Sequence, residues 1–412
     1  MQKFLARQPI FDSRQEVFGY ELLFRSCLDN FFDPSQSGLA ATSTADNFFL
    51  FGVDHLTRGR LAFINCTRDF LVGDYATLFP KNRVVLELLE DIRPDEQIIA
   101  ACNRLKQAGY TIALDDFRDT PEWRPLVALA DIIKVDVLAT EPREQSRLAK
   151  AYSSLGIRML AEKVESYDVF ERTLDCGYTL FQGYFFSRPQ ILERHDIPAN
   201  KLNYLLVLQA VNRKTLDLRE VAERIKAEAS LSYRLLRYLN SPIFFLVTDV
   251  RSIPHALTLL GERGIRKWVS LVAIGCMGAD KPHELIVQPL IRARFCELLA
   301  IPSGMSESAN DLFLLGLLSS IDALLDMRME DVLKEIAIVG EIRDALLGKD
   351  NSLREVFDLA LTYETGSWDR LDKMVARLGI TPEDLPEIFI QAVDWARGIL
   401  TGQEISEAPH EG

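Results

Sequence analysis

The first 190 residues alternate short apolar runs with stretches of helical periodicity, and this alternation restricts the possible folds more than any other feature of the sequence. The runs VVLEL and DIIKVDV are apolar on both faces, as expected for strands that helices cover on both sides. Helical patterns fill the intervals between runs, for example at residues 95–107 and 145–153. Together with the opening FLARQPIF, about eight strands fit this region, so the pattern predicts either a closed (β/α)8 barrel or an open, doubly wound sheet.

Polar side chains at the ends of these runs distinguish between the two folds. Nearly every run delivers an acid, an amide or a lysine at or near its C-terminal end, where barrel enzymes place their reactive groups. A doubly wound sheet that binds a dinucleotide needs a glycine-rich phosphate turn after its first strand, and no GxGxxG pattern is present. The sequence therefore predicts a barrel with one shared mouth. The residues at the ends of the runs are Glu21, Asn65, Glu87, Glu90, Asp115, Asp116, Lys134, Asp136, Glu162, Glu165 and Gln182.

The acids of this set indicate a metal site when they are taken together. A single acid at a strand end is more often a helix cap or a solvated loop charge. Five or more carboxylates in one mouth, however, would repel one another strongly unless cations neutralise them. Carboxylate and amide oxygens suit Mg²⁺ or Mn²⁺, and the adjacent Asp115 and Asp116 can serve two ions. We therefore expect a binuclear site, which is the usual arrangement for attack of water on a phosphodiester.

Eight ordered motifs of this region resemble those of the EAL family of cyclic di-GMP phosphodiesterases. They read QPIF, ELLFR, IN, LELLE, LDDF, KVD, AEKVE and QGYFFSRP, and Glu21-Leu22-Leu23 stands where the family has its name-giving Glu-Ala-Leu. The resemblance implies a TIM-like barrel that binds the cyclic dinucleotide at its C-terminal rim and hydrolyses one phosphodiester bond to give linear pGpG.

The resemblance also implies a role for each residue that matches a motif. Lys134 would orient the attacking water, and Glu162 would act as general base or metal-linked acid. Glu90 would anchor the loop that follows the LDDF motif. The implied metal ligands are Glu21, Asn65, Glu87 and Asp115 for one ion and Asp115 with Asp116 for the second. The implied ligand-binding residues are Gln8, Arg25, Asp136, Glu165 and Gln182.

Two departures from the family pattern bear on turnover. After LDDF the family continues Gly-(Thr/Ala)-Gly-Tyr-Ser-Ser-Leu, whereas this chain reads RDTPEWRP over residues 118–125. Proline fixes φ and glycine permits positive φ, so this loop cannot follow the family's path. Lys163 replaces the glycine of the usual AEGVE and brings a cation next to the expected metal cluster, where it either points outward or interferes. The sequence therefore predicts metal binding with little or no turnover.

From about Lys201 onward the strand-like runs give way to amphipathic helical patterns, which predicts an all-helical second domain. The segments SLSYRLLRYLNSP, SIPHALTLLGERGIRKWV and LFLLGLLSSIDALL resemble the HDOD domain, a relative of the HD phosphohydrolases. An active HD enzyme needs His-Asp where this chain has Ser319-Ser320, and His255 and His283 are isolated. We therefore expect a regulatory module that binds another protein and has no hydrolase activity.

The predicted boundaries follow from these patterns. We expect a barrel at residues 1–190, a linker at 191–202, a helical HDOD domain at 203–400 and a disordered tail at 401–412.

Composition excludes several classes of function. The formal charge of −13 disfavours binding to the phosphate backbone of nucleic acid. No apolar run approaches the roughly 20 residues that cross a membrane, and the N-terminus lacks a signal sequence, so we expect a cytoplasmic protein. The six cysteines form no Cys-x-x-Cys pair and are expected to be reduced and mostly buried.

Three functions remain open at this point. In the preferred hypothesis the barrel senses cyclic di-GMP, and the HDOD domain passes its state to an unidentified signalling protein. The alternative is an active phosphodiesterase, hydrolysing cyclic di-GMP to pGpG under control of the HDOD domain. The third is a scaffold with vestigial acids, which the repulsion among unused carboxylates disfavours. Because barrels of this family often pair, a homodimer is also allowed.

Overall fold

A computed structural model describes residues 4–25, 56–185, 199–213, 215–227, 231–232, 234–235, 252–336, 338 and 340–401. The chain separates into two compact units, one formed by Met1–Arg188 with Thr362–Asp372 and the other by Pro189–Leu361 with Lys373–Gly412. The assignment of residues 362–372 to the first unit has no counterpart in the sequence pattern. The expected linker and tail lie largely outside the described residues, so those boundaries stay predictions.

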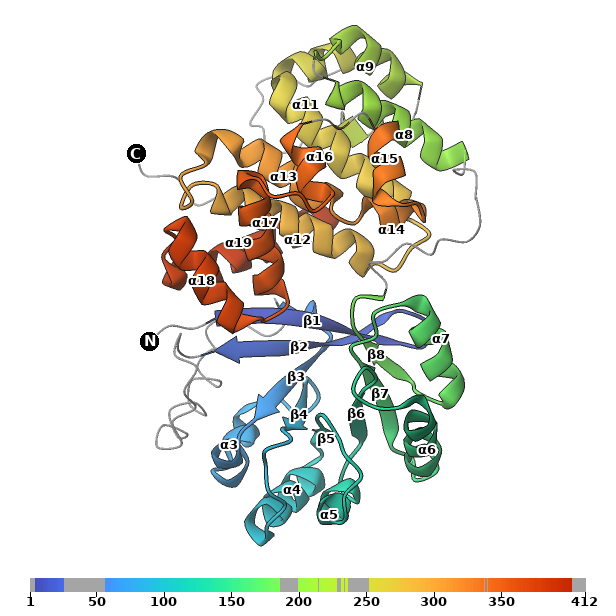
Figure 1. Cartoon of the computed structure of the whole chain (residues 1–412), viewed down its shortest axis with the longest axis vertical. Coiled ribbons are helices and arrows are strands. Elements are labelled where there is room, and N and C mark those ends of the chain that lie inside the picture. The colour runs from blue at the N-terminus through green and yellow to red at the C-terminus, as the bar shows by residue number, and fades with distance from the viewer. Residues whose placement is uncertain are drawn as a thin grey trace. The chain divides into compact units, whose positions relative to one another are not determined.

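The first unit contains a closed barrel of eight strands that follow one another in chain order, as Figure 1 shows. The predicted barrel is therefore confirmed. Strand β1 runs antiparallel to both of its neighbours, and the other adjacent strands are parallel. The strands are β1 (Phe4–Asp12), β2 (Val17–Arg25), β3 (Leu61–Cys66), β4 (Val84–Leu88), β5 (Thr111–Leu114), β6 (Ile132–Asp136), β7 (Arg158–Glu162) and β8 (Leu180–Gln182).

Helices connect the parallel strands, and their ends carry ordinary capping signals. The side chain of Asp95 accepts a hydrogen bond from the backbone of Ile98 at the start of α4, and Gly109 ends that helix at φ 92°. Ser166 caps α7 in the same way as Asp95 caps α4. The α-helices described in this unit are α3 (Arg68–Val72), α4 (Glu96–Ala108), α5 (Arg124–Val127), α6 (Pro142–Ser153) and α7 (Tyr167–Cys176).

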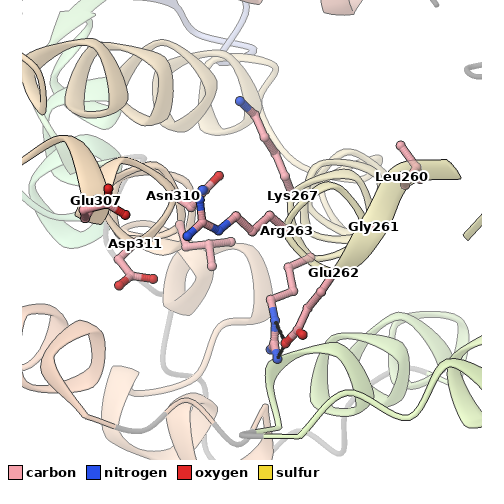
Figure 2. Close-up of a pocket in the computed structure, with 10 residues that line it drawn as sticks. Leu260, Gly261, Glu262, Arg263, Lys267, Glu307, Asn310 and Asp311 are labelled. Atoms are coloured by element: carbon pink, nitrogen blue, oxygen red, sulfur yellow. Dashed lines mark hydrogen bonds and ion pairs between the residues drawn. The ribbon is translucent and has the colours of Figure 1, made fainter. Parts of the chain in front are cut away.

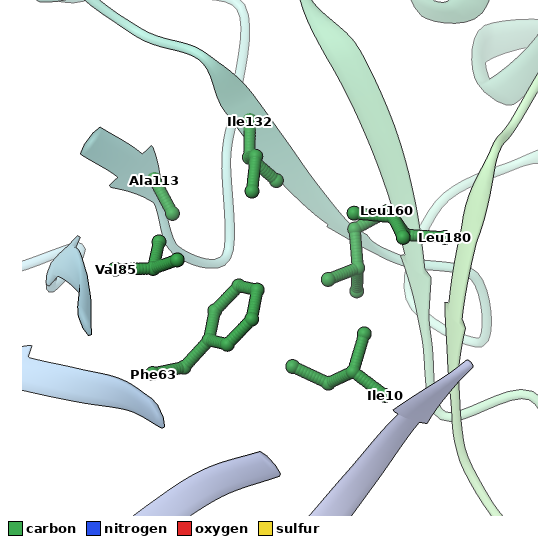
Figure 3. Packing of buried hydrophobic residues seen from close by; sticks show 7 residues of the cluster. All are labelled: Ile10, Phe63, Val85, Ala113, Ile132, Leu160 and Leu180. Carbon is green, nitrogen blue, oxygen red and sulfur yellow. The ribbon is translucent and has the colours of Figure 1, made fainter. Parts of the chain in front are cut away.

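A layer of apolar side chains fills the barrel beneath its mouth, as Figure 3 shows. Each of these side chains is at most 1% exposed, and seven of the strands contribute one each. Because side chains on a strand alternate between two faces, the residue two positions along also points into the barrel. The layer therefore determines which residues line the next level towards the mouth. It consists of Ile10, Phe63, Val85, Ala113, Ile132, Leu160 and Leu180.

The second unit is helical in every element that the structure describes between residues 199 and 361, in agreement with the expected HDOD architecture. Helix α11 (Ile253–Met277) is kinked at Gly261, whose φ of 65° and ψ of 173° are not helical. Trp268 of this helix is buried. The α-helices described from residue 199 onward, of which α17 and α18 lie partly in residues 362–372, are α8 (Ala199–Asn212), α9 (Leu218–Lys226), α11 (Ile253–Met277), α12 (Glu284–Leu299), α13 (Ala309–Leu318), α14 (Ile321–Leu325), α15 (Met329–Glu335), α16 (Glu341–Leu346), α17 (Ser352–Glu364), α18 (Trp368–Leu378) and α19 (Leu385–Thr401).

In the second unit, Ser319 stands where an active HD enzyme would need a metal ligand. Ser319 accepts a hydrogen bond from the Arg292 guanidinium (2.6 Å) and donates one to the carbonyl of Gly316 (2.6 Å). Cys66, Cys102 and Cys296 are buried free thiols, which fits the expected reduced cysteines. No helix in the described part of the chain combines the length and apolar character needed to cross a membrane.

Candidate active site at the barrel mouth

The polar residues of the mouth lie one level above the apolar layer. Six of them stand two positions after a layer residue, as Glu87 follows Val85 and Lys134 follows Ile132. Glu21 comes from β2, which contributes no side chain to the layer. On the antiparallel β1 the order is reversed, and Gln8 precedes Ile10 by two positions. Alternation along the strands thus brings side chains that are far apart in sequence onto one ring. The ring consists of Gln8, Glu21, Asn65, Glu87, Asp115, Lys134, Glu162 and Gln182.

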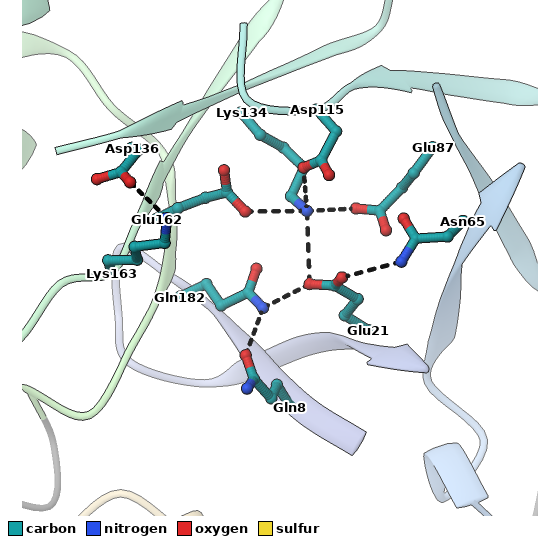
Figure 4. Close-up of polar contacts among 10 residues, drawn as sticks. All are labelled: Gln8, Glu21, Asn65, Glu87, Asp115, Lys134, Asp136, Glu162, Lys163 and Gln182. Carbon is teal, nitrogen blue, oxygen red and sulfur yellow. Dashed lines mark hydrogen bonds and ion pairs between the residues drawn. The ribbon is translucent and has the colours of Figure 1, made fainter. Parts of the chain in front are cut away.

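The ammonium of Lys134 lies at the centre of this ring, as Figure 4 shows. Its side chain is buried and bonds four carboxylates that come from four different strands. The distances from Nζ are 2.7 Å to Asp115, 2.8 Å to Glu87, 3.0 Å to Glu162 and 3.4 Å to Glu21. One positive charge therefore faces four acids in a site of low dielectric constant.

This imbalance perturbs the pKa values of the acids. Burial raises the pKa of Glu87 well above its ordinary value, and burial together with the neighbouring acids raises the pKa of Glu162 to about 8. Burial also raises the pKa of Asp115. The mouth therefore holds protons at neutral pH that ordinary carboxyls would have lost.

Lys134 and Glu21 are held in their charged forms. Burial lowers the pKa of Lys134, but the four surrounding acids outweigh burial and raise it well above its ordinary value. Burial likewise raises the pKa of Glu21, and the charge of Lys134 with the hydrogen bonds from Gln182 and Asn65 brings it below its ordinary value. The ion pair between Lys134 and Glu21 is thus the fixed charge pair of the mouth.

The two glutamines extend the hydrogen-bond network. The side-chain amide of Gln182 donates to Glu21 (2.6 Å) and to Gln8 (3.0 Å). Gly183 follows at φ 148°, and a Cβ there would lie 2.2 Å from the backbone oxygen of Val164. Glycine at this position lets the ends of β7 and β8 approach closely enough for Gln182 to enter the ring.

Several buried oxygen atoms of the ring have no hydrogen-bond donor. They include Oε2 of Glu87, Oδ1 of Asn65 and Oε1 of Gln182. Buried acceptors are normally satisfied, so these atoms point to a missing donor or cation. The carboxylate and amide oxygens of the ring are the ligands that Mg²⁺ and Mn²⁺ prefer, so the donor set fits a divalent metal.

The arrangement of the donors is centred on the ammonium of Lys134. Among the described residues, no three acids, histidines or cysteines converge on a separate point where they could hold a metal ion as they stand. Loading of a metal therefore requires carboxylates to turn away from Lys134.

The other predicted site residues lie outside the ring. Asp136 stands at its edge, where one oxygen accepts the amides of Leu138 (2.8 Å) and Ala139 (3.0 Å) and the other contacts Lys163 (2.5 Å). Asp116 adopts a positive φ of 39°. Glu90 and Glu165 are exposed, and the side chain of Arg25 lies outside the described residues. Their predicted roles, like those of the ring residues, stay predictions.

The loop after Asp116 has anchors that the sequence did not reveal. Asp119 accepts hydrogen bonds from Arg147 (2.7 Å) and from the hydroxyl of Tyr152 (2.8 Å). The ring of Phe117 packs edge-on against Trp123 and Tyr152. In the sequence, these contacts could have been suspected only from the aromatic and charged residues that the loop and α6 both contain. Half of the residues that line a cavity of about 900 Å³ beside this loop are acids, namely Glu90, Asp116, Asp119, Glu122, Asp136, Glu141 and Glu144.

Comparison with known proteins identifies both parts of the chain. The EAL domain family matches residues 71–189, and the HDOD domain family matches residues 197–351. The chain is 33% identical over 409 residues to the uncharacterized protein YuxH of Bacillus subtilis (strain 168), covering 97% of this chain and 99% of YuxH. It is 30% identical over 400 residues to the cyclic di-GMP phosphodiesterase CdgJ of Vibrio cholerae, covering 96% of this chain and 93% of CdgJ.

A solved complex of Klebsiella pneumoniae BlrP1 with calcium and cyclic di-GMP is 22% identical, with a TM-score of 0.39, over 46% of this chain and 56% of BlrP1. The two resemblances drawn from the sequence motifs are confirmed by the two domain families and by the full-length relatives. The chain therefore belongs to the family of proteins in which an EAL barrel is joined to an HDOD domain.

Proposed function

We propose that the barrel mouth binds a divalent cation, Mg²⁺ or Mn²⁺, and cyclic di-GMP, and that this protein signals the bound state with little hydrolysis of the ligand. The observation that carries the proposal is the set of four carboxylates around Lys134, three of them buried, in a ring where several buried oxygens lack a donor. The full-length similarity to CdgJ, which is named a cyclic di-GMP phosphodiesterase, supports the choice of ligand.

The residues that would hold the metal are Glu21, Asn65, Glu87 and Asp115, whose oxygens form the donor set of the mouth. A bound divalent ion would polarise a phosphate oxygen and make water more acidic. Lys134 stays charged and presents its ammonium to anionic groups in the mouth. Glu162, whose pKa is raised to about 8 by burial and by neighbouring acids, can take up or release a proton near neutral pH.

Slow turnover is proposed because of the loop over residues 117–125. Arg147 and Tyr152 donate hydrogen bonds to Asp119, and Trp123 packs against Phe117, so the loop is held in one conformation. A loop fixed in this way cannot rearrange freely when a substrate enters. The second candidate function, an active phosphodiesterase, is favoured by the complete set of ring residues and by the name of CdgJ.

The helical domain completes the proposal as the module that contacts a partner protein. The hydrogen bonds of Ser319 to Arg292 and Gly316 support a structural role at the position where HD enzymes bind metal. The partner protein, a homodimer and the cytoplasmic location stay predictions.

Calorimetry on the full-length protein tests the proposal. Cyclic di-GMP should bind in the presence of Mn²⁺, and binding should weaken at least about tenfold in EDTA or in a Glu21→Ala variant. Glu16→Ala serves as a matched control, because Glu16 is an exposed acid in the turn before β2, away from the mouth. Absence of binding with either metal would refute the proposal.

Chromatography of the same mixtures separates the two candidate functions. If cyclic di-GMP stays intact for many half-lives of its complex with the protein, the protein is a sensor. Conversion of the bound ligand to pGpG within the same time supports the phosphodiesterase.

A further inference from the structure

The carboxylates of the mouth form two groups, an inner group around Lys134 and an outer group at the edge of the mouth. Asp115 turns inward to Lys134, and its neighbour Asp116 belongs to the outer edge together with Asp136. The inner group is neutralised in part by Lys134. The outer group faces a second ammonium, that of Lys163, which Figure 4 shows beside Asp136.

Lys163 is held at this edge by a specific contact. Its ammonium lies 2.5 Å from an oxygen of Asp136, whose other oxygen is fixed by the backbone amides of Leu138 and Ala139. The hydrogen bond from Lys163 to Asp136 raises the pKa of Lys163, with smaller contributions from the charges of Asp116 and Glu162. The side chain therefore points to the acids of the mouth, which answers the question that the sequence left open.

The backbone of Lys163 adopts a conformation that is unusual for a lysine. Its φ is 56°, a conformation that glycine adopts freely and that lysine adopts at a cost. Asp116 has a positive φ as well, at 39°. Such a conformation persists where surrounding contacts hold it, and for Lys163 the contact is the ion pair with Asp136.

We propose that the ammonium of Lys163 is the resident cation of the outer carboxylates Asp116 and Asp136, so that the mouth takes up one divalent ion at the inner group and excludes a second. This inference rests on the proposed metal binding at the inner group. An ammonium and a divalent ion within a few ångströms repel each other strongly at the dielectric constant of a protein rim. Asp136 also has no free oxygen to offer while Lys163 and the two amides occupy it.

The test is the number of Mn²⁺ ions bound per chain, measured by calorimetry and by metal analysis after gel filtration. We expect about one ion for the wild type. Lys163→Gly removes the charge and suits the positive φ, so it should fold and bind about two ions. The second ion should bind at least about tenfold more tightly than any second ion in the wild type.

Two further variants serve as controls. Lys163→Arg keeps the charge at the same backbone position and should bind about one ion. Arg58→Gly also removes a cation at a positive φ (55°), but Arg58 lies before β3 at the other end of the barrel. It should bind the same number of ions as the wild type.

The outcomes distinguish this inference from the proposed function on which it rests. Two ions bound by the wild type, or only one by Lys163→Gly, would overturn the role of Lys163 and leave metal binding intact. No Mn²⁺ bound by the wild type would overturn the proposed function itself, and the inference would fall with it.

Discussion

Replacing Lys134 by methionine tests the central electrostatic argument for the mouth. The substitution keeps much of the side chain's bulk and removes the one positive charge that lies within 3.4 Å of four carboxylates. Breaking a buried ion pair by removing one partner typically destabilises a protein by about 3–5 kcal/mol. Some of the acids can take up protons instead, because burial already raises the pKa of Glu87 and of Glu162.

We therefore expect Lys134→Met to lose about 3–5 kcal/mol of unfolding free energy at pH 7 in EDTA. For a domain of this size each kcal/mol corresponds to roughly 2–4 °C, so the melting temperature of the barrel should fall by roughly 6–20 °C. The assay is thermal unfolding followed by circular dichroism. Lys106→Met is the matched control, because the ion pair of Lys106 with Asp131 is half-buried, with the two side chains 35% and 36% exposed, and its loss should cost about 1 kcal/mol.

Addition of Mn²⁺ supplies the second half of this test. The ion should stabilise the Lys134→Met variant at least as much as the wild type, since it replaces the missing charge among the same carboxylates. At a hundredfold excess over the dissociation constant, binding contributes about 2.7 kcal/mol. A variant as stable as the wild type in EDTA, or one that Mn²⁺ does not stabilise, would refute the argument.

Three further predictions concern pH, backbone and loop. Burial raises the pKa of Glu162 from 4.5 to about 8, so the folded state keeps a proton that the unfolded state loses. Its contribution to stability in EDTA is complete below pH 4.5 and should be lost as pH rises to about 8, at up to about 1.4 kcal/mol per unit. The unfolding free energy measured in urea should thus vary less with pH in Glu162→Gln than in the wild type. The same pH dependence in both proteins would contradict this. Gly183→Ala should cost at least about 2 kcal/mol in urea unfolding, because its Cβ would lie 2.2 Å from the backbone oxygen of Val164, and an unchanged midpoint would refute the clash. Asp119→Ala should cost about 1–3 kcal/mol and speed proteolysis within residues 117–125, since it removes the acceptor of Arg147 and Tyr152; unchanged cleavage would contradict the anchoring role.

The sequence predicts which side chains form the apolar layer and which form the polar ring, because side chains alternate strictly between the two faces of a strand. Once Val85 and Ile132 are recognised as apolar layer positions, Glu87 and Lys134 must point into the same barrel one level higher. The reversed direction of β1 was also predictable. Only residues 13–16 separate β1 from β2, and a parallel connection needs a dozen residues or more.

Other features depend on contacts that no local pattern encodes. The sequence places Lys134 at the mouth, but its position among four carboxylates depends on the rotamers of five side chains from different strands. The direction of Lys163 depends on Asp136, whose carboxylate is oriented by the amides of Leu138 and Ala139. The anchoring of Asp119 likewise depends on residues that α6 supplies about thirty positions later in the chain.

The two ammonium groups link the stability of the barrel to its affinity for metal. Lys134 neutralises part of the inner charge, and Lys163 contacts Asp136 of the outer pair, so both groups carry an internal cation when no divalent ion is bound. A divalent ion that binds must compete with these ammonium groups for the same carboxylates. A stronger contact between a lysine and its acids therefore stabilises the metal-free barrel and weakens the binding of metal. Removal of Lys134 should therefore lower the stability of the metal-free barrel and strengthen binding of the inner ion. Removal of Lys163 should strengthen binding of the outer ion with little loss of stability, because Lys163 is more than half exposed and strained in φ. Variants in which both lysines changed stability and metal stoichiometry in the same way would contradict the division of the mouth into two groups.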